Sequence, residues 1–260
     1  MKKREKLKDK VISIYREAKK DLTTVRNIND LALFTSVSSS MKDTGPITIT
    51  TGMYGDDPIT LMTLGGTEFV DGQATTFKES KLASYGMSND YILNVLDLFH
   101  SGAVPSDREI ILTGISLGGM IAQQVMADEY VREHYKFKAI VCFGSPLVPP
   151  LNNRLDKVWR LCDSHDIVPK SGAIALRKQR KKYGGKKAIN TLISSLDARE
   201  RHIRTSIYKN PLKAHMLSYV STNVWNDVDF DGVDGDSSAI IKLDTPLVFY
   251  PNPIRGIDKN

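Results

Sequence analysis

The sequence predicts a single α/β domain with a mostly parallel central sheet and helices on both faces. Strand-like and helix-like segments alternate between residues 58 and 170, as they do where helices connect parallel strands. At residues 109–127 a strand-like segment, a glycine-rich turn and a helix-like segment follow one another. The chain is 41% hydrophobic and 25% charged. Its length of 260 residues is enough for one domain with a large core and short for two domains.

The chain begins with a basic segment that we expect to be helical over residues 1–30. An apolar stripe lies between its lysines and arginines: Val11, Ile12, Ile14, Tyr15 and Ala18. Such a stripe is typical of a helix that packs on a domain. The segment lacks the apolar stretch of a signal peptide, and no run in the sequence approaches the length of a transmembrane helix. We therefore expect a cytoplasmic protein, or one released by a route other than general secretion.

The core elements are expected between residues 46 and 220. Strands at 46–52 and 58–64 are predicted by Ile- and Thr-rich runs on either side of a Tyr-Gly-Asp-Asp turn. A helix at 89–99 is predicted by the spacing of its apolar residues. The later core elements, in chain order, are a strand at 109–113, a helix at 120–127, and strands at 138–144 and 158–162.

The remaining segments differ from this alternation. Residues 172–214 are basic and mostly helical in composition, and we expect them to lie over one end of the sheet. For residues 221–260 we expect an acidic loop, a strand near 239–243 and a tail rich in proline and aromatic residues. All of these segments are expected to belong to the one domain, residues 1–260.

Positive charge is concentrated in two clusters. The formal net charge is +6, and the clusters are the first twenty residues and the run 177–187. Basic clusters attract anionic lipid headgroups or nucleic acid, although many are simply solvated helix faces. The sequence has no zinc-ligand spacing and no aromatic-laced nucleic-acid module. We therefore expect transient contact with an anionic membrane surface and no nucleic-acid partner.

Gly114-Ile115-Ser116-Leu117-Gly118 matches the pattern G-x-S-x-G at a strand-to-helix turn. A serine on such a turn is held in strained backbone geometry, with its hydroxyl exposed above the sheet and a helix N-terminus beside it. An ordinary glycine-rich turn of an α/β protein is the alternative. The pattern predicts a nucleophilic serine, Ser116.

A serine hydroxyl needs an imidazole base, and the base needs a carboxylate that orients it. Asp166 follows the strand at 158–162, where ligand-facing loops of a parallel sheet lie. His215 is the best placed later histidine. Asp163 is an alternative acid, and His202 is an alternative base that its cationic neighbours disfavour. The other histidines are expected to have structural roles: His100, His134 and His165.

Four segments, in order, resemble the class 3 (fungal-type) lipase family of the α/β-hydrolases over residues 46–220. They are Leu64-Gly65-Gly66-Thr67, Gly114-Ile115-Ser116-Leu117-Gly118-Gly119, Phe143-Gly144-Ser145-Pro146-Leu147-Val148 and Asp166-Ile167-Val168-Pro169, and His215 shortly before Tyr219 is the family's usual ending. Each segment alone is a weak signal. Their shared order makes the resemblance specific.

The resemblance implies a serine hydrolase that cleaves carboxylic esters of lipids, acylglycerols or phospholipids, without a metal or cofactor. Ser116 would be the nucleophile, Asp166 the acid and His215 the base. The N–H groups of Thr67 and Leu117 would stabilise the oxyanion. An acyltransferase with the same three residues, or a lipid-binding domain without turnover, are the alternatives.

The chain departs from the family pattern in three places. Gly65 replaces the arginine before Gly-Thr, Ile115 replaces the histidine of the serine motif, and residues 68–90 show no obvious lid helix. The absence of a lid would affect activation at lipid surfaces rather than ester hydrolysis itself.

Two further features of the sequence lie outside the four lipase-like segments. Asp227 to Asp231 match the first half of a calcium-binding loop, but Ser238 occupies the position where that loop needs Glu. We expect an acidic solvated loop there. Cys142 and Cys162 lie in strand-like segments and are expected to be free, buried thiols.

Overall fold

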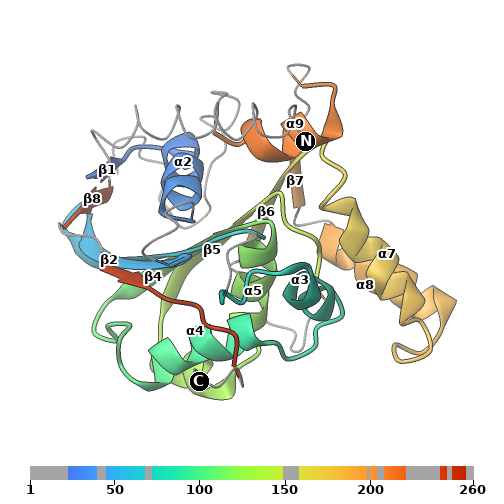
Figure 1. Ribbon diagram of the computed structural model, residues 1–260, viewed down its shortest axis with the longest axis horizontal. Helices are drawn as coiled ribbons and strands as arrows, with labels where there is room; N and C mark the ends of the chain where they lie inside the picture. Colours follow the sequence, from blue (N-terminus) through green and yellow to red (C-terminus); the bar gives the residue numbers. More distant parts are fainter. Residues whose placement is uncertain are drawn as a thin grey trace.

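One nine-stranded sheet runs through the described part of the chain (Figure 1). The computed structural model describes residues 23–39, 45–67, 72–148, 158–197, 200–203, 208–220, 241–244 and 248–255. The strand order is β1-β8-β2-β3-β4-β5-β6-β7, and β9 also pairs with β2. The strands are β1 (Thr24–Val25), β2 (Ile47–Tyr54), β3 (Asp57–Leu64), β4 (Glu109–Ile115), β5 (Phe137–Phe143), β6 (Val158–Asp163), β7 (Glu200–Ile203), β8 (Ile241–Leu243) and β9 (Val248–Tyr250).

The sheet is mixed, so the prediction of a mostly parallel sheet is wrong. Strands β3, β4, β5, β6 and β7 are parallel to one another. The two-residue turn between β2 and β3 makes those strands antiparallel, and β8, β9 and β1 extend that side in antiparallel pairs. A turn this short cannot connect parallel strands, which need a crossover of a dozen or more residues.

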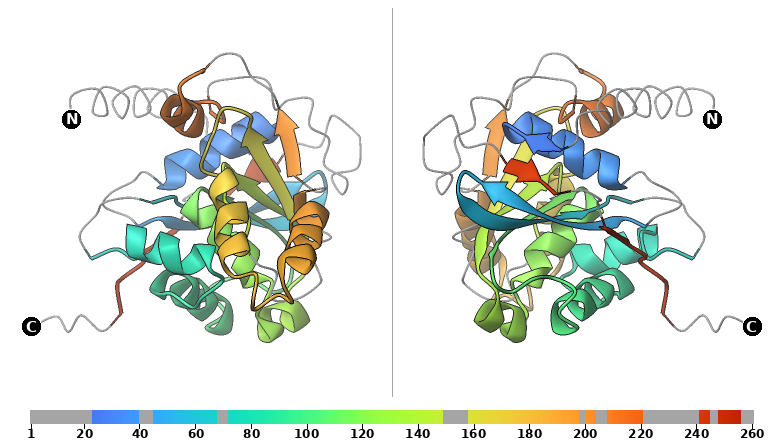
Figure 2. Two further views of the ribbon diagram at one scale, coloured as in Figure 1. Left: turned by 90° about the vertical axis from the view of Figure 1, so that its right-hand side faces the viewer. Right: turned by 90° about the vertical axis from the view of Figure 1, so that its left-hand side faces the viewer.

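Helices cover both faces of the sheet, as predicted (Figures 1 and 2). Helix α2 lies on one face together with α9, and α3, α4 and α5 lie on the other. The helices are α2 (Ile28–Ser39), α3 (Phe77–Ser84), α4 (Asp90–His100), α5 (Leu117–Val125), α6 (Glu129–His134), α7 (Lys170–Lys178), α8 (Lys186–Asp197) and α9 (Pro211–Leu217).

Strand β4 shows how alternate side chains supply two cores. Ile110 and Leu112 belong to the apolar cluster under α4 and α5, whereas Ile111 belongs to the cluster under α2. Successive side chains of a strand point to opposite faces. The continuous apolar run of β4 is therefore buried on both sides, and the turn that follows it is fixed on a rigid base.

The predicted N-terminal helix needs a correction within the described residues. Its apolar stripe lies outside them, but Thr24–Val25 is a strand, β1, which pairs with β8. Helix α2 then begins at Ile28, and the side chain of Asn27 accepts the N–H of Asp30 at its start. β-Branched residues before an Asn favour a strand followed by a helix cap.

The two cysteines are free and buried, as predicted. Burial raises the pKa of the Cys142 thiol to about 12, so at pH 8 about one molecule in ten thousand carries the reactive thiolate there. We expect neither thiol to react with a disulfide reagent in the folded protein within the time that free cysteine reacts fully. Both should react after unfolding in urea. Rapid labelling of the folded protein would contradict this burial.

Among the residues that the structure describes, none belongs to a helix that is both long and apolar enough to span a lipid bilayer.

Candidate active site

Ser116 lies between β4 and α5 in a conformation that is rare for residues other than glycine. Its φ is 53° and its ψ is −115°, and among the described residues it is the one non-glycine with positive φ. Its N–H donates to the carbonyl oxygen of Phe143 on the neighbouring strand, at 2.9 Å. Such geometry costs about 1–3 kcal/mol and persists where the surrounding structure imposes it. The turn holds the Ser116 side chain at the carboxyl end of β4.

Two glycines of the serine motif allow this turn to pack closely. A Cβ on Gly114 would lie 2.3 Å from the carbonyl carbon of Gly118, and a Cβ on Gly118 would lie 2.1 Å from the carbonyl oxygen of Leu64. Both distances are far shorter than atoms tolerate. Gly114 therefore allows the start of α5 to pack on β4, and Gly118 allows it to approach the end of β3.

We expect Gly118→Ala to lower the free energy of unfolding by about 3 kcal/mol or more, because backbone atoms must move to admit the methyl group. Urea denaturation measures this loss. Gly102→Ala is the control: Gly102 has φ +74° with no atom within 4 Å of its would-be Cβ, so only the conformational cost of about 1–2 kcal/mol applies. Equal losses in the two variants would contradict the close packing.

His215 joins Ser116 to Asp166 in one row of hydrogen bonds. The Nε2 atom of His215, on α9, lies 3.1 Å from the Ser116 Oγ, and its Nδ1 lies 2.8 Å from the Asp166 Oδ2. The His215 side chain is 17% exposed and that of Asp166 is fully buried. An ionised carboxylate only accepts hydrogen bonds, so Nδ1 carries the proton and Nε2 is free to accept the serine proton.

Asp166 is held by two further donors besides His215. The Tyr219 hydroxyl donates to Oδ2 at 2.8 Å, and the Val168 N–H donates to Oδ1 at 2.9 Å. A buried carboxylate with several donors keeps a fixed orientation and has its desolvation offset. Gly144, with φ +56°, leaves room for this arrangement, because a Cβ there would lie 2.8 Å from the Tyr219 ring and 3.0 Å from Oδ2 of Asp166.

The Tyr219 hydroxyl links Asp166 to the end of β6. Besides donating to Asp166, it accepts the N–H of Asp163 at 3.0 Å. Burial, followed by the nearby charge of Asp166, raises the pKa of Tyr219 well above its usual value. The hydroxyl therefore keeps its proton and remains a donor. From the sequence alone, this tyrosine stands out only as part of the usual ending of the lipase family that the chain resembles. The signal in the sequence that could have identified its role is its position four residues after His215, at the end of a helix.

The alternative acid and bases have other partners. The buried Asp163 carboxylate accepts the N–H of His165 at 2.7 Å and so shapes the loop before Asp166. His100 lies 3.4 Å from Asp128, and the ring of His134 stacks on Tyr130. His202 contributes backbone to β7, and its side chain is outside the description. Of the two candidate carboxylates, Asp166 is the one that lies within hydrogen-bond distance of His215.

The predicted oxyanion donors lie on two segments beside Ser116. Leu117 is the first residue of α5, where N–H groups have no acceptor within the helix. Thr67 follows Gly66, whose would-be Cβ lies 3.4 Å from the Ser116 Cβ, so this segment runs against the serine turn. At Gly65, where the family has arginine, the carbonyl oxygen accepts the hydroxyl of buried Tyr91 at 3.2 Å. That bond fixes the segment without a salt bridge.

Helix α3 is an element that the sequence analysis missed between residues 68 and 90. The Thr76 side chain accepts the N–H of Glu79 at its start, and this Thr-x-x-Glu pattern is the signal that predicts such a helix. Ser80 on α3 shares a hydrogen bond of 2.7 Å with the hydroxyl of Thr67. The helix therefore supports the segment beside Ser116.

In the part of the chain that the structure describes, no cluster of three or more His, Cys, Asp and Glu side chains is arranged to hold a metal ion. The acidic loop from Asp227 to Asp231 lies outside the described residues.

No family model and no curated protein matches the sequence. Among solved structures, the chain is similar to the Lip2 lipase from Yarrowia lipolytica, with 16% identity over 44% of this chain and 52% of that one and a TM-score of 0.31. A structure of the nonglycosylated Yarrowia lipolytica LIP2 lipase gives 13% identity over 48% and 61%, with a TM-score of 0.27. The chain thus spans about half to three fifths of their lengths.

Proposed function

We propose that this protein has an α/β-hydrolase fold and is a serine hydrolase that cleaves carboxylic esters of lipids, acylglycerols or phospholipids, through an acyl-serine intermediate. The observation that supports this proposal most strongly is the row of hydrogen bonds from Ser116 through His215 to Asp166, at 3.1 and 2.8 Å. Serine, imidazole and carboxylate in this order form the arrangement that activates a hydroxyl for acyl transfer.

In the proposed reaction, the Ser116 Oγ attacks the ester carbonyl carbon while His215 Nε2 takes its proton. The N–H groups of Leu117 and Thr67 stabilise the negative charge on the carbonyl oxygen. The carbon–oxygen bond to the leaving group then breaks, and His215 returns the proton to give the free alcohol. Water next attacks the acyl-serine, losing a proton to His215, which passes it to the departing Ser116 oxygen as the carboxylic acid leaves.

Exposed aliphatic and aromatic side chains near these residues favour a lipid substrate. Ile167, next to Asp166, is 60% exposed, and Leu212, one helical turn before His215, is 47% exposed. Phe77 is 66% exposed and lies one turn before Ser80, which is bonded to Thr67. Three elements that carry the site therefore each present an apolar side chain to the surroundings, as a surface that meets acyl chains requires.

Release of product from two kinds of ester tests the proposal. We expect the protein to release p-nitrophenol from a short p-nitrophenyl ester and fatty acid from an emulsified acylglycerol. Added alcohol separates the acyltransferase alternative, which would give mainly a new ester rather than the acid. No release from any ester, together with retained binding to liposomes, would contradict hydrolysis and support the binding domain without turnover.

Tyr219 is a positioning residue in this proposal, since it acts through Asp166. Tyr219→Phe removes one hydrogen bond to a charged group, and we expect kcat to fall about tenfold while KM is unchanged. Because the raised pKa keeps the hydroxyl protonated, the ratio of variant to original rates should be constant from pH 7 to pH 10. Steady-state kinetics across this range measures the ratio.

Tyr135→Phe is the matched control for this prediction. The buried Tyr135 hydroxyl donates to the carbonyl oxygen of Phe99, away from the site. Its loss should lower stability and leave kcat unchanged. Equal effects of the two substitutions on kcat would contradict the positioning role of Tyr219.

A further inference from the structure

A cavity lies between helices α7 and α8, apart from the residues proposed for ester cleavage. The two helices form a hairpin beside the β6–β7 side of the sheet (Figure 1). Between them is a cavity of about 700 Å³, within the range of small-molecule sites. Its lining includes Arg177, Arg180, Lys186, Asn190, Ile193 and Ser194.

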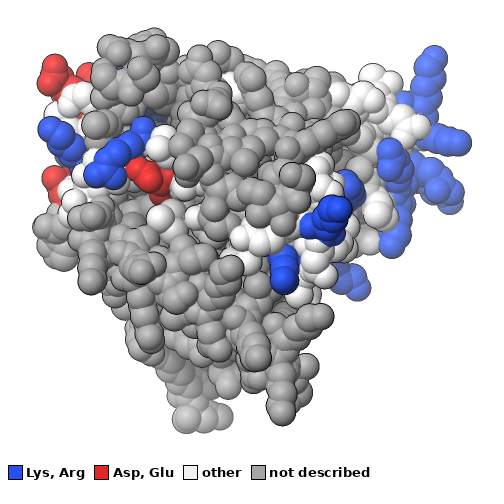
Figure 3. Space-filling view, turned by 90° about the horizontal axis from the view of Figure 1, so that it is seen from above, with Lys and Arg blue, Asp and Glu red and all other residues white. Residues whose placement is uncertain are grey.

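The charge of this hairpin is strongly positive. Residues 170–197 contain eight Lys and Arg side chains and one acidic residue, Asp197 at the end of α8. Figure 3 shows blue side chains gathered over the α7–α8 side of the molecule. Arg177, Arg180 and Lys186 have no salt bridge or side-chain hydrogen bond to any described residue. Like charges that share one hollow repel each other, so an anion in that hollow would be stabilised by all three.

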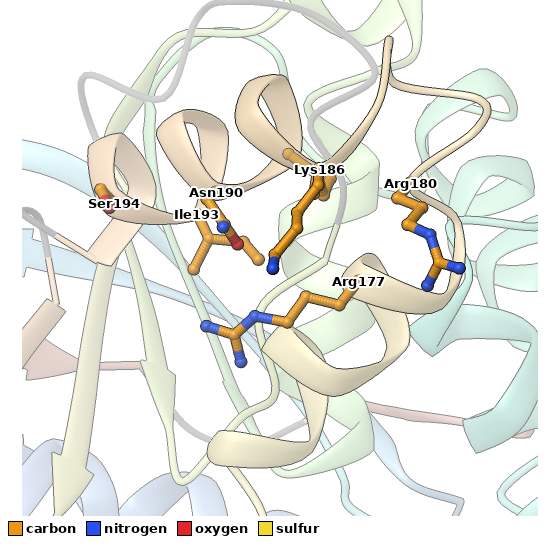
Figure 4. A pocket seen from close by; sticks show the side chains of 7 residues that line it. Arg177, Arg180, Lys186, Asn190, Ile193 and Ser194 are labelled. Carbon is orange, nitrogen blue, oxygen red and sulfur yellow. The ribbon is translucent and has the colours of Figure 1, made fainter.

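The side chains that line the cavity are arranged to contact such an anion. Figure 4 shows Arg177 of α7 and Lys186 of α8 extending into the space between the helices. Lys186, Asn190 and Ser194 are spaced four residues apart, so they lie along one face of α8. The cavity therefore combines cationic groups with neutral hydrogen-bond donors, which is the chemistry that binds phosphate oxygens.

The start of α8 gives a separate reason for an anion here. Helix N-termini carry a partial positive charge and favour acidic residues in the first turn. Helix α8 has no acidic residue in its first turn and begins with Lys186 and Lys187 instead. Two lysines at this position destabilise the isolated helix, because their charge has the same sign as that of the helix N-terminus. A phosphate bound in the cavity would compensate the charge of Lys186, which lines it, and that of the helix end.

The hairpin is also fixed in place by its own apolar core. Leu176, Ile189 and Ile193 are buried together with Leu147, and Gly172 lets α7 approach closely, since a Cβ there would lie 2.3 Å from the Leu147 N. Leu176 and Ile189 adjoin or lie one turn from the cations of the cavity. The cationic side chains therefore project from a packed scaffold and not from a free loop.

We infer that the α7–α8 cavity binds the phosphate groups of anionic phospholipids and so holds the protein on a membrane surface. The choice of a lipid surface rests on the proposed function. Helix α7 begins at Lys170, just after Asp166, and Arg177 lies about 10 Å further along the helix axis. Ile174, on the stretch between, is 55% exposed. A bilayer that meets the phosphate site can thus also meet the apolar side chains around Ser116.

Binding to vesicles tests this inference independently of hydrolysis. The experiment uses the full chain with Ser116→Ala, so that failure of ester cleavage does not affect the result. Flotation compares vesicles of phosphatidylcholine alone with vesicles that also contain phosphatidylglycerol, whose only charge is its phosphate. We expect binding to the second kind only. Substituting Arg177, Arg180 and Lys186 together by Gln should weaken it about a hundredfold, since each cation near an anionic surface contributes about a factor of five.

The matched control replaces Lys178, Lys181 and Lys187 by Gln. It removes the same charge from exposed positions of the same hairpin that do not line the cavity, and should weaken binding much less. Circular dichroism checks that both variants fold. Equal weakening would overturn the inference in favour of diffuse attraction. So would tight binding of soluble glycerol 3-phosphate without vesicles, or stronger binding of a single-stranded RNA than of vesicles.

Discussion

Replacement of Ser116 by alanine is expected to lower kcat for ester hydrolysis by about a millionfold. The substitution removes the oxygen that attacks the ester, while the positions of His215 and the N–H donors are kept. His215→Ala should cost about the same, because a serine hydroxyl without its base is a poor nucleophile. Hydrolysis of a p-nitrophenyl ester by highly purified protein measures both losses.

The double variant provides the stricter form of this prediction. If Ser116 and His215 act as one unit, removing both should cost no more than removing either, whereas independent contributions would multiply. Circular dichroism and urea denaturation provide the control that each variant folds. Retention of more than about one hundredth of the original kcat by Ser116→Ala would assign the hydrolysis to another group.

Asp166→Asn is expected to have the second largest effect, a loss of about ten-thousandfold in kcat. The side-chain amide has nearly the same shape as the carboxylate, but it can donate a hydrogen bond to His215 Nδ1. That would place the imidazole proton on Nε2, where it cannot accept the proton of Ser116. KM should change little, because Asp166 is buried and does not contact substrate.

Asp163→Asn is the matched control for Asp166. The Asp163 side chain is equally buried, and its Oδ1 accepts the His165 N–H, a bond that the Asn oxygen can keep. We expect kcat within about threefold of the original, since a neutral acceptor replaces a charged one. A larger loss in Asp163→Asn than in Asp166→Asn would exchange the roles of the two carboxylates and contradict the account.

Much of the fold could be predicted because its central strands have simple patterns. The continuous apolar run of β4 and the glycine-rich turn after it specify a buried strand followed by a helix. The turn cluster between β2 and β3 predicts a hairpin. Ser116 and Asp166 are far apart along the chain but close in space, because β4, β5 and β6 are parallel and adjacent. The carboxyl ends of β4 and β6 therefore lie at the same end of the sheet, where His215 joins them.

The remainder depends on contacts that the sequence pattern does not contain. Strand β7 is short and carries charged residues, and its place beside β6 is set by pairing rather than by its own propensity. The antiparallel side of the sheet depends on β8 and β9, which come from the far end of the chain. The hydrogen bond between Tyr219 and Asp166 could not be predicted, because two residues 53 positions apart leave no periodic pattern in the sequence.

The proposed ester cleavage requires that the Oγ atom of Ser116 takes up the acyl group, and covalent labelling tests this directly. A fluorophosphonate probe reacts with activated serines, and digestion followed by mass spectrometry locates the adduct. We predict one adduct, on the peptide that contains Ser116, and none in His215→Ala. An adduct on a different serine, or equal labelling of the His215→Ala protein, would contradict the proposed site.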